Sequence, residues 1–120
     1  MRGSAVVVLA LGALASAQTY EGFPTSLSCK LTSGGTAEIS KIEAQDTIVG
    51  PKGSKIDDSA ANVASGFCVS LSGIPLYAAY VPDKGTVYFA FDKAKDTYYF
   101  CSAQGAVDQT GYPSACATTY

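Results

Sequence analysis

Hydrophobic positions along the chain fall into short groups with different periods. The first is an unbroken apolar run at residues 5–13, which follows Arg2 and leads into residues 14–17 (LASA). A charged start, an apolar core and a small-x-small ending are typical of a cleavable export signal. The run is too short for a membrane anchor, which needs about 20 apolar residues. The pattern predicts a signal peptide over residues 1–17 and one small secreted, extracellular domain over residues 18–120.

A single helix is predicted in the first half of that domain. Residues 18–28 are expected to be extended, because Pro24 disfavours the helical conformation before it. Within residues 36–47, Ile39 and Ile42 then occur at helical spacing among good helix formers. The two isoleucines are therefore expected to form the core face of this helix.

The second half of the domain shows the two-residue period of strands. Residues 50–60 are rich in turn formers and predict a loop. Val87, Phe89 and Phe91 alternate with less apolar residues, so they predict one core-facing side of a strand. Strands are expected at residues 67–71, 77–81, 86–91 and 97–101, the last two forming a hairpin. Together these elements predict an α+β fold in which one helix packs on a curved antiparallel sheet.

Four cysteines change this picture by adding covalent links: Cys29, Cys68, Cys101 and Cys116. In an exported chain, an even number of cysteines predicts two disulfides. A zinc site is disfavoured because the cysteines are far apart in sequence and the chain has no histidine. The residues themselves leave all three disulfide pairings open. No metal or cofactor is predicted, since no phosphate-binding glycine loop is present either.

The charge balance argues against nucleic acid as a strong ligand. The chain carries ten acidic residues against eight basic ones, and its only arginine, Arg2, lies in the predicted signal. Affinity for nucleic acid comes largely from basic side chains that meet phosphates. The candidate basic residues are Lys84, Lys93 and Lys95, whose neighbours Asp83, Asp92 and Asp96 offset them. Solvated turns are the favoured interpretation of these lysines.

A series of short motifs occurs in an order that resembles the fungal secreted guanyl-preferring ribonucleases. The similarity is closer to the ribonuclease-like effectors secreted by plant-pathogenic fungi. No single motif is specific, and their order over about residues 27–101 carries the resemblance. The motifs are Cys29 before a helix, Asn62 before Gly66-Phe67, Ile74-Pro75-Leu76, Tyr77 or Tyr80, residues 82–89 (PDKGTVYF) and Phe100-Cys101.

The resemblance also implies that this chain lacks the family's chemistry. The family's catalytic carboxylate falls on or near Gly73 here, its arginine falls on Thr86, and the two histidines have no counterpart. Cleavage of RNA through its 2′-hydroxyl needs a base, an acid and a cation. The chain is therefore expected not to be an enzyme. The family's pairing of first and last cysteines implies the disulfides Cys29–Cys101 and Cys68–Cys116.

Three functions are compatible with the sequence. The first is a non-catalytic, virulence-type effector, a monomer that binds a host target, with protein favoured over RNA. The second is a cell-wall or carbohydrate-binding surface module, for which Tyr77, Tyr88 and Tyr98 are outward-facing candidates. The third is a small extracellular hydrolase that uses two carboxylates, as glycosidases do. Its candidates are Glu38, Glu43, Asp57 and Asp58, and their spacing singles out no pair.

Overall fold

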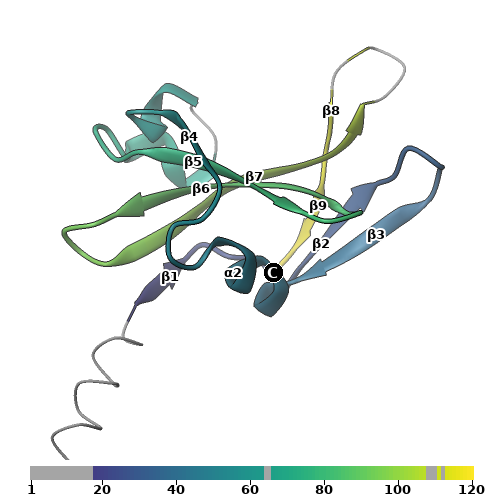
Figure 1. Cartoon of the computed structure of the whole chain (residues 1–120), viewed down its shortest axis with the longest axis horizontal. Coiled ribbons are helices and arrows are strands. Elements are labelled where there is room, and N and C mark those ends of the chain that lie inside the picture. The colour runs from purple at the N-terminus through teal and green to yellow at the C-terminus, as the bar shows by residue number, and fades with distance from the viewer. Residues whose placement is uncertain (1–17, 64–65, 108–110, 112) are drawn as a thin grey trace, which may run out of the picture.

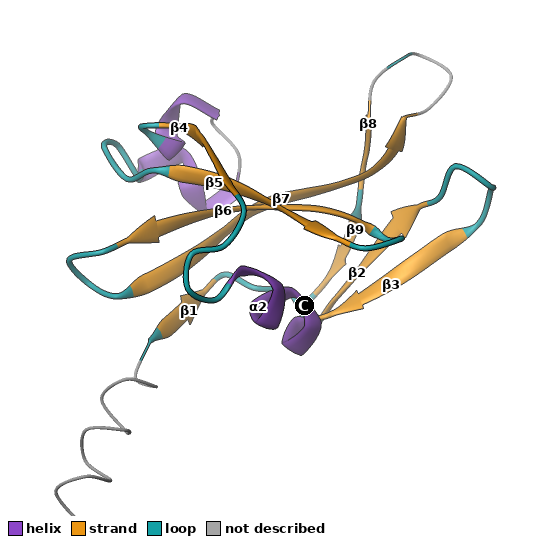
Figure 2. Cartoon of the chain, in the orientation of Figure 1, coloured by secondary structure: helices purple, strands orange, loops and turns teal. Residues whose placement is uncertain are grey.

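The computed structural model describes residues 18–63, 66–107, 111 and 113–120, so the predicted signal peptide lies outside the described residues. Strands dominate this part of the chain (Figures 1 and 2). The strands are β1 (Thr19–Glu21), β2 (Ser26–Lys30), β3 (Thr36–Ser40), β4 (Ser54–Asp57), β5 (Leu76–Val81), β6 (Gly85–Asp92), β7 (Thr97–Val107), β8 (Pro113–Ala115) and β9 (Ala117–Thr119). The helical elements are α2 (Lys41–Ile48) and two 3-10 helices, η1 (Ala60–Val63) and η2 (Gly66–Ser70).

The strands form two sheets that share the C-terminal segment. The larger sheet has the order β1-β7-β6-β5-β4, with β8 also paired to β7, and the smaller sheet has the order β3-β2-β9. Only β1 runs parallel to its neighbour, β7. The chain passes from β8 in one sheet to β9 in the other at Cys116, so its last residues join the two sheets (Figure 1).

The predicted α+β fold is wrong, because a second sheet takes the place of half the expected helix. Residues 36–40 form β3, which pairs antiparallel with β2, and only residues 41–48 are helical. Gly34 and Gly35, at φ 91° and 77°, reverse the chain between these strands. Ile39 is buried opposite Leu27, whereas Ile42 is 70% exposed, so the two isoleucines share no helix face.

The start of the helix is fixed by a serine cap at its first turn. The Ser40 hydroxyl accepts a hydrogen bond from the Glu43 backbone N–H at 3.1 Å. Such a cap satisfies an amide that has no partner within the helix. In the described part of the chain, no helix has the length and apolar character needed to cross a bilayer.

Two further local predictions are wrong on either side of the first 3-10 helix. Residues 54–57 form the edge strand β4 where a loop was expected, and residues 66–70 form η2 where a strand was expected. In η2, Cys68 is buried while Val69 is exposed. The disulfide at Cys68 and the turn around Asp57 hold this segment, and neither constraint is visible as a period of hydrophobic residues.

The predicted strand at residues 77–81 and the predicted hairpin are confirmed. Strand β5 pairs with β6, and β6 pairs with β7 across the charged turn at residues 93–96. Val87, Phe89 and Phe91 are all buried in one core, as their alternation predicts. The two-residue alternation in this strand matches the burial of its side chains. The sequence alone was therefore sufficient to predict the strand and the hairpin.

The larger sheet buries residues on both faces. Phe100 lies opposite Phe89 and Ser102 lies opposite Tyr88, so Cys101 is the extra residue of a β-bulge. The bulge shifts the alternation of the residues after it, so that Ala103 returns to the main core opposite Val87. Phe100 belongs to the main core with Phe89, while Cys101, the next residue along the strand, faces the other side and belongs to a second cluster. That second cluster contains Ala60, Cys68, Leu76, Ala90 and Cys101.

The disulfides are Cys29–Cys116 and Cys68–Cys101, so the pairing implied by the family resemblance is wrong. Cys29 belongs to the main core and Cys101 to the second cluster, on the other side of the sheet. Two cysteines bond only when their Cα atoms lie within about 7 Å and their side chains point toward each other. The sheet thus keeps Cys29 and Cys101 apart.

Strands β2 and β7 cross so closely that Gly105 has no room for a side chain. A Cβ atom at Gly105 would lie 2.6 Å from the Lys30 carbonyl oxygen and 2.8 Å from the Lys30 nitrogen. Because both atoms belong to the backbone, a methyl group must push the two sheets apart. We expect Gly105→Ala to lower the free energy of unfolding by about 1–3 kcal/mol, as overpacking does. Urea denaturation checks this, and an unchanged midpoint would contradict the crossing.

Candidate functional site

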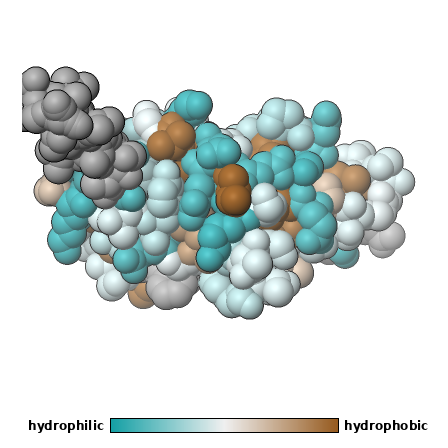
Figure 3. Space-filling view, turned by 90° about the horizontal axis from the view of Figure 1, so that it is seen from below, coloured by the Kyte–Doolittle hydropathy of each residue, from teal (hydrophilic) through white to brown (hydrophobic). Residues whose placement is uncertain are grey.

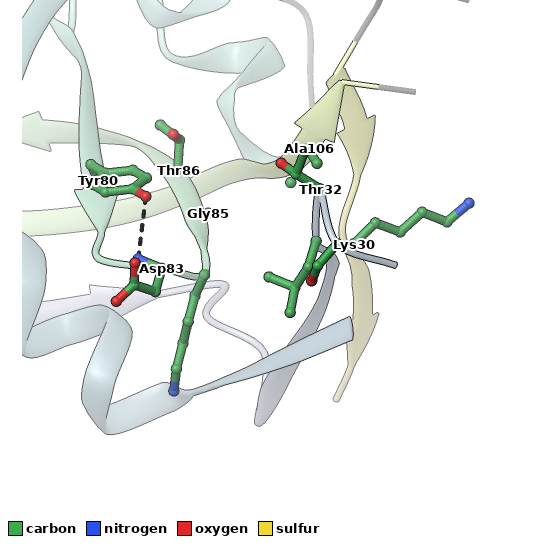
Figure 4. Close-up of a pocket in the computed structure, with 11 residues that line it drawn as sticks. Lys30, Thr32, Tyr80, Asp83, Gly85, Thr86 and Ala106 are labelled. Carbon is green, nitrogen blue, oxygen red and sulfur yellow. Dashed lines mark hydrogen bonds between the residues drawn. The ribbon is translucent and has the colours of Figure 1, made fainter. Parts of the chain in front are cut away.

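A pocket lies where the β5–β6 turn faces the β2–β3 hairpin, and we call it the Tyr80 pocket (Figure 4). It has a volume of about 580 Å³ and is lined by residues 30–33, Tyr80, residues 83–86, Gly105 and Ala106. These residues come from both sheets, so the crossing at Gly105 shapes it. The volume falls within the range of pockets that take small ligands, about 300–1,000 Å³.

An exposed aromatic ring forms one wall of this pocket. The Tyr80 side chain is 63% exposed, and its hydroxyl oxygen accepts a hydrogen bond from the Asp83 backbone N–H at 3.2 Å (Figure 4). Tyr80 pairs across the strands with Thr86, while its neighbours Ala79 and Val81 face the core. The ring is thus held by one bond and by the strand, with much of its surface open to solvent.

Asp83 stands beside this ring in an unusual backbone conformation. It lies in the turn closed by the bond from the Lys84 N–H to the Val81 carbonyl, 3.0 Å, and its φ is +63°. A left-handed residue that is not glycine costs about 1–2 kcal/mol. Among the described residues, no hydrogen bond or ion pair is made by the Asp83 carboxylate. The turn therefore holds an uncompensated carboxylate at the pocket.

The two lysines of the Tyr80 pocket do not offset this carboxylate. Lys84 Nζ binds Glu43 Oε1 at 2.9 Å and the Glu38 carbonyl oxygen at 2.8 Å, on the side of β3 and α2. The Lys30 side chain extends away from Tyr80 and Asp83 (Figure 4). Asp83 is consequently the one carboxylate among the described residues that line the pocket, and neither lysine pairs with it.

The three candidate lysines do not form one basic patch. Lys84 precedes β6, whereas Lys93 and Lys95 follow it in the turn at residues 93–96. Eight strand residues span about 26 Å at 3.3 Å per residue. The grouping of Lys84 with Lys93 and Lys95 is therefore wrong.

Of the three tyrosines predicted to face outward, Tyr98 is wrong. It is fully buried in the main core, opposite Phe91 in the register. Tyr77 is half-buried and stacks on Phe89 at 5.3 Å between ring centroids. Tyr88 is also half-buried, and its hydroxyl donates to Gln104 Oε1 at 2.9 Å.

Sequence reasoning missed Tyr80 as the aromatic residue of the site. The signal was present, because Tyr80 alternates with Ala79 and Val81 directly before the turn. If the two neighbours face the core, the period of a strand places Tyr80 on the other face. The choice among eight tyrosines needed this register, which only the β5–β6 pairing supplies.

The four candidate carboxylates of a hydrolase are dispersed, and neither the Tyr80 pocket nor the second pocket below contains one of them. Glu43 binds Lys84, and Glu38 lies exposed on β3. Two hydrogen bonds hold the pKa of Asp57 below its ordinary value. The larger effect comes from the Ser59 backbone N–H and the smaller from the Asn62 side chain. Asp58 binds Lys55 at 2.8 Å, and this bond raises the pKa of Lys55.

A second pocket of about 660 Å³ lies at the opposite end of β6. It is lined by Pro51, residues 73–75, Tyr77, residues 91–94 and Asp96. Both of its carboxylates have structural partners. Asp92 Oδ1 accepts bonds from the N–H groups of Ala94 and Lys95, and Asp96 Oδ1 accepts one from Gln18 Nε2. This pocket thus offers fewer unpaired polar groups than the Tyr80 pocket.

Metal-ligating side chains do not gather in the part of the chain that the structure describes: no group of three or more His, Cys, Asp or Glu residues is placed to hold an ion. Comparison with protein-family models, with curated proteins and with solved structures finds no match to this chain.

Proposed function

We propose that the mature chain is a secreted, non-catalytic carbohydrate-binding protein that holds a glycan at the Tyr80 pocket. The exposed ring of Tyr80, fixed by its bond to Asp83, is the observation that carries the proposal. Secretion is supported by the two disulfides, which are typical of proteins matured in an oxidising compartment, and by the signal pattern of residues 1–17.

The chemistry of the pocket suits a sugar. The apolar C–H face of a pyranose ring packs on an aromatic face, and a tyrosine contributes a large rigid surface for this. Around Tyr80, the hydroxyl groups of Thr32, Ser33 and Thr86 can both donate and accept hydrogen bonds. A glycan presents the same mixture of apolar faces and hydroxyl groups, so both parts of the ligand find partners.

The exposed apolar residues give less support to a large protein interface. Ile42, Ile56, Val69, Tyr80 and Tyr120 lie on five different segments of the chain. In the view of Figure 3, hydrophobic residues form separate spots among hydrophilic ones. Stable interfaces usually have a contiguous apolar centre. Membership among the ribonuclease-like effectors, with a host protein as target, remains a prediction from motif order.

The test is retention on insoluble polysaccharides, with chitin and β-glucan as probes. We expect the protein to be retained on at least one of them and Tyr80→Ala to weaken retention about tenfold, the loss of about 1.4 kcal/mol of stacking. Tyr120→Ala is the matched control, because Tyr120 is similarly exposed, 69%, and lies outside the pocket. Absence of retention, or equal retention of the Tyr80→Ala protein, would reject the proposal.

A further inference from the structure

We infer that the Tyr80 pocket selects glycans that carry free, protonated amino groups, and that Asp83 makes this selection. The inference rests on the proposed carbohydrate binding and adds the class of sugar. Two observations meet at one point: an exposed aromatic ring and a carboxylate that has no partner among the described residues. Their combination is chemically more specific than either alone.

The turn fixes the Tyr80 ring relative to the backbone of Asp83. The Asp83 N–H donates to the Tyr80 hydroxyl, and the Lys84 N–H closes the same turn on Val81. The positive φ of Asp83 is a conformation that glycine would adopt more easily. An aspartate at this position thus costs stability while it places a carboxylate beside the ring.

An alkylammonium group is the ligand chemistry that uses both features. The face of an aromatic ring attracts a cation, and a carboxylate forms a charge-assisted hydrogen bond with an ammonium group. A glucosamine unit supplies the ammonium and the sugar ring together. An N-acetylated unit has lost the charge, and a uronic acid carries a charge of the wrong sign.

Neighbouring charges leave this selection to Asp83. Lys84 is bound to Glu43, and that pair lies toward β3 and α2. The Lys30 side chain points out of the pocket (Figure 4). No other charged residue lines the pocket, as far as the described residues show. Of the charged groups that line the pocket, Asp83 is consequently the one placed to pair with a cationic ligand beside Tyr80.

The experiment is calorimetric titration of the mature protein with short oligomers of equal length. The probes are oligomers of glucosamine, N-acetylglucosamine and galacturonic acid, at a mildly acidic pH where the free amine is protonated. We expect the wild-type protein to bind the glucosamine oligomer about tenfold more tightly than the acetylated one, and the uronic acid oligomer least, from one cation–π contact and one charge-assisted bond at an exposed site.

Asp83→Asn is the decisive variant, since asparagine also tolerates a positive φ and only the charge is lost. We expect it to lose most of the preference for the amino oligomer and to keep only the part that comes from the Tyr80 ring, with affinity for the acetylated oligomer unchanged. Glu21→Gln removes a charge from exposed strand β1, outside the pocket, and should keep the preference. Near-UV circular dichroism of both variants establishes that each is folded.

The outcomes separate the two proposals. Equal binding of all three oligomers by the wild-type protein, with loss in Tyr80→Ala, overturns the role of Asp83 and leaves carbohydrate binding intact. A preference for the amino oligomer that is undiminished in Asp83→Asn also overturns it. Binding of none of the oligomers, together with no retention on the polysaccharides, rejects both.

Discussion

Replacement of Cys29 and Cys116 by alanine is expected to lower the free energy of unfolding by about 4 kcal/mol, according to the chain-entropy account of disulfides. This bridge closes the longer loop, with a sequence separation of 87, and the other bridge lies within that loop. It also fixes Cys116, where the chain leaves β8 and enters β9. Its loss therefore enlarges the unfolded ensemble and releases the segment that joins the sheets.

Urea denaturation of the double variant, beside the wild-type protein, measures this effect. The loss is a large share of the 5–15 kcal/mol that small domains typically have. Replacement of Cys68 and Cys101 serves as the comparison, because it removes a bridge while Cys29–Cys116 remains. A loss below about 1 kcal/mol for the first variant would contradict both the bridge and the chain-entropy reasoning.

Replacement of Tyr98 by alanine is expected to cost about 3–5 kcal/mol, the range for large aromatic residues removed from a core. Tyr98 is fully buried, and its ring lies 4.7 Å from that of Phe91 and 5.0 Å from that of Tyr20. The partial burial of Tyr20 against this ring raises the pKa of the Tyr20 hydroxyl, and the nearby Tyr98 raises it further. A cavity at Tyr98 would remove packing from β1, β6 and β7 together.

Tyr98→Phe separates the hydroxyl group from the ring. That hydroxyl accepts a bond from the Gly50 N–H at 2.7 Å and donates to Gln18 Oε1 at 3.2 Å. We expect its removal to cost about 0.5–1.5 kcal/mol, the net contribution of a typical hydrogen bond, because water can reach Gly50 and Gln18 once the hydroxyl is gone. Thermal and urea denaturation measure these effects. We expect Tyr98→Ala to be the least stable protein, Tyr98→Phe to be intermediate and the wild type to be the most stable. Equal stabilities of all three would show that Tyr98 lies outside the core.

The sequence predicts the fold best where the spacing of hydrophobic residues matches the burial of the same side chains in the structure. The β6–β7 hairpin is such a place, since Val87, Phe89 and Phe91 alternate and are all buried. Residues 36–40 mislead because helix formers there are overridden by pairing with β2. Local propensity is a weak signal beside a ladder of hydrogen bonds and a buried Ile39.

The site was harder to predict because it depends on strand register. The outward assignment of Tyr98 assumed an alternation within β7 that the pairing with Phe91 contradicts. The disulfides depend on which face of the sheet each cysteine occupies: Cys101 shares the second cluster with Cys68, while Cys29 lies in the main core. Neither a register nor a bulge leaves a mark in the composition or spacing of these residues.

The position of β9 has a consequence for how the chain acquires its shape. β9 pairs with β2, so segments that lie far apart in the sequence lie side by side in the smaller sheet. Contacts of such high sequence separation form slowly, because a long loop must close before they give any stability. The β5–β6 and β6–β7 hairpins pair residues that are close in sequence. We therefore expect these hairpins to form first and the β2–β9 pairing to complete the smaller sheet last.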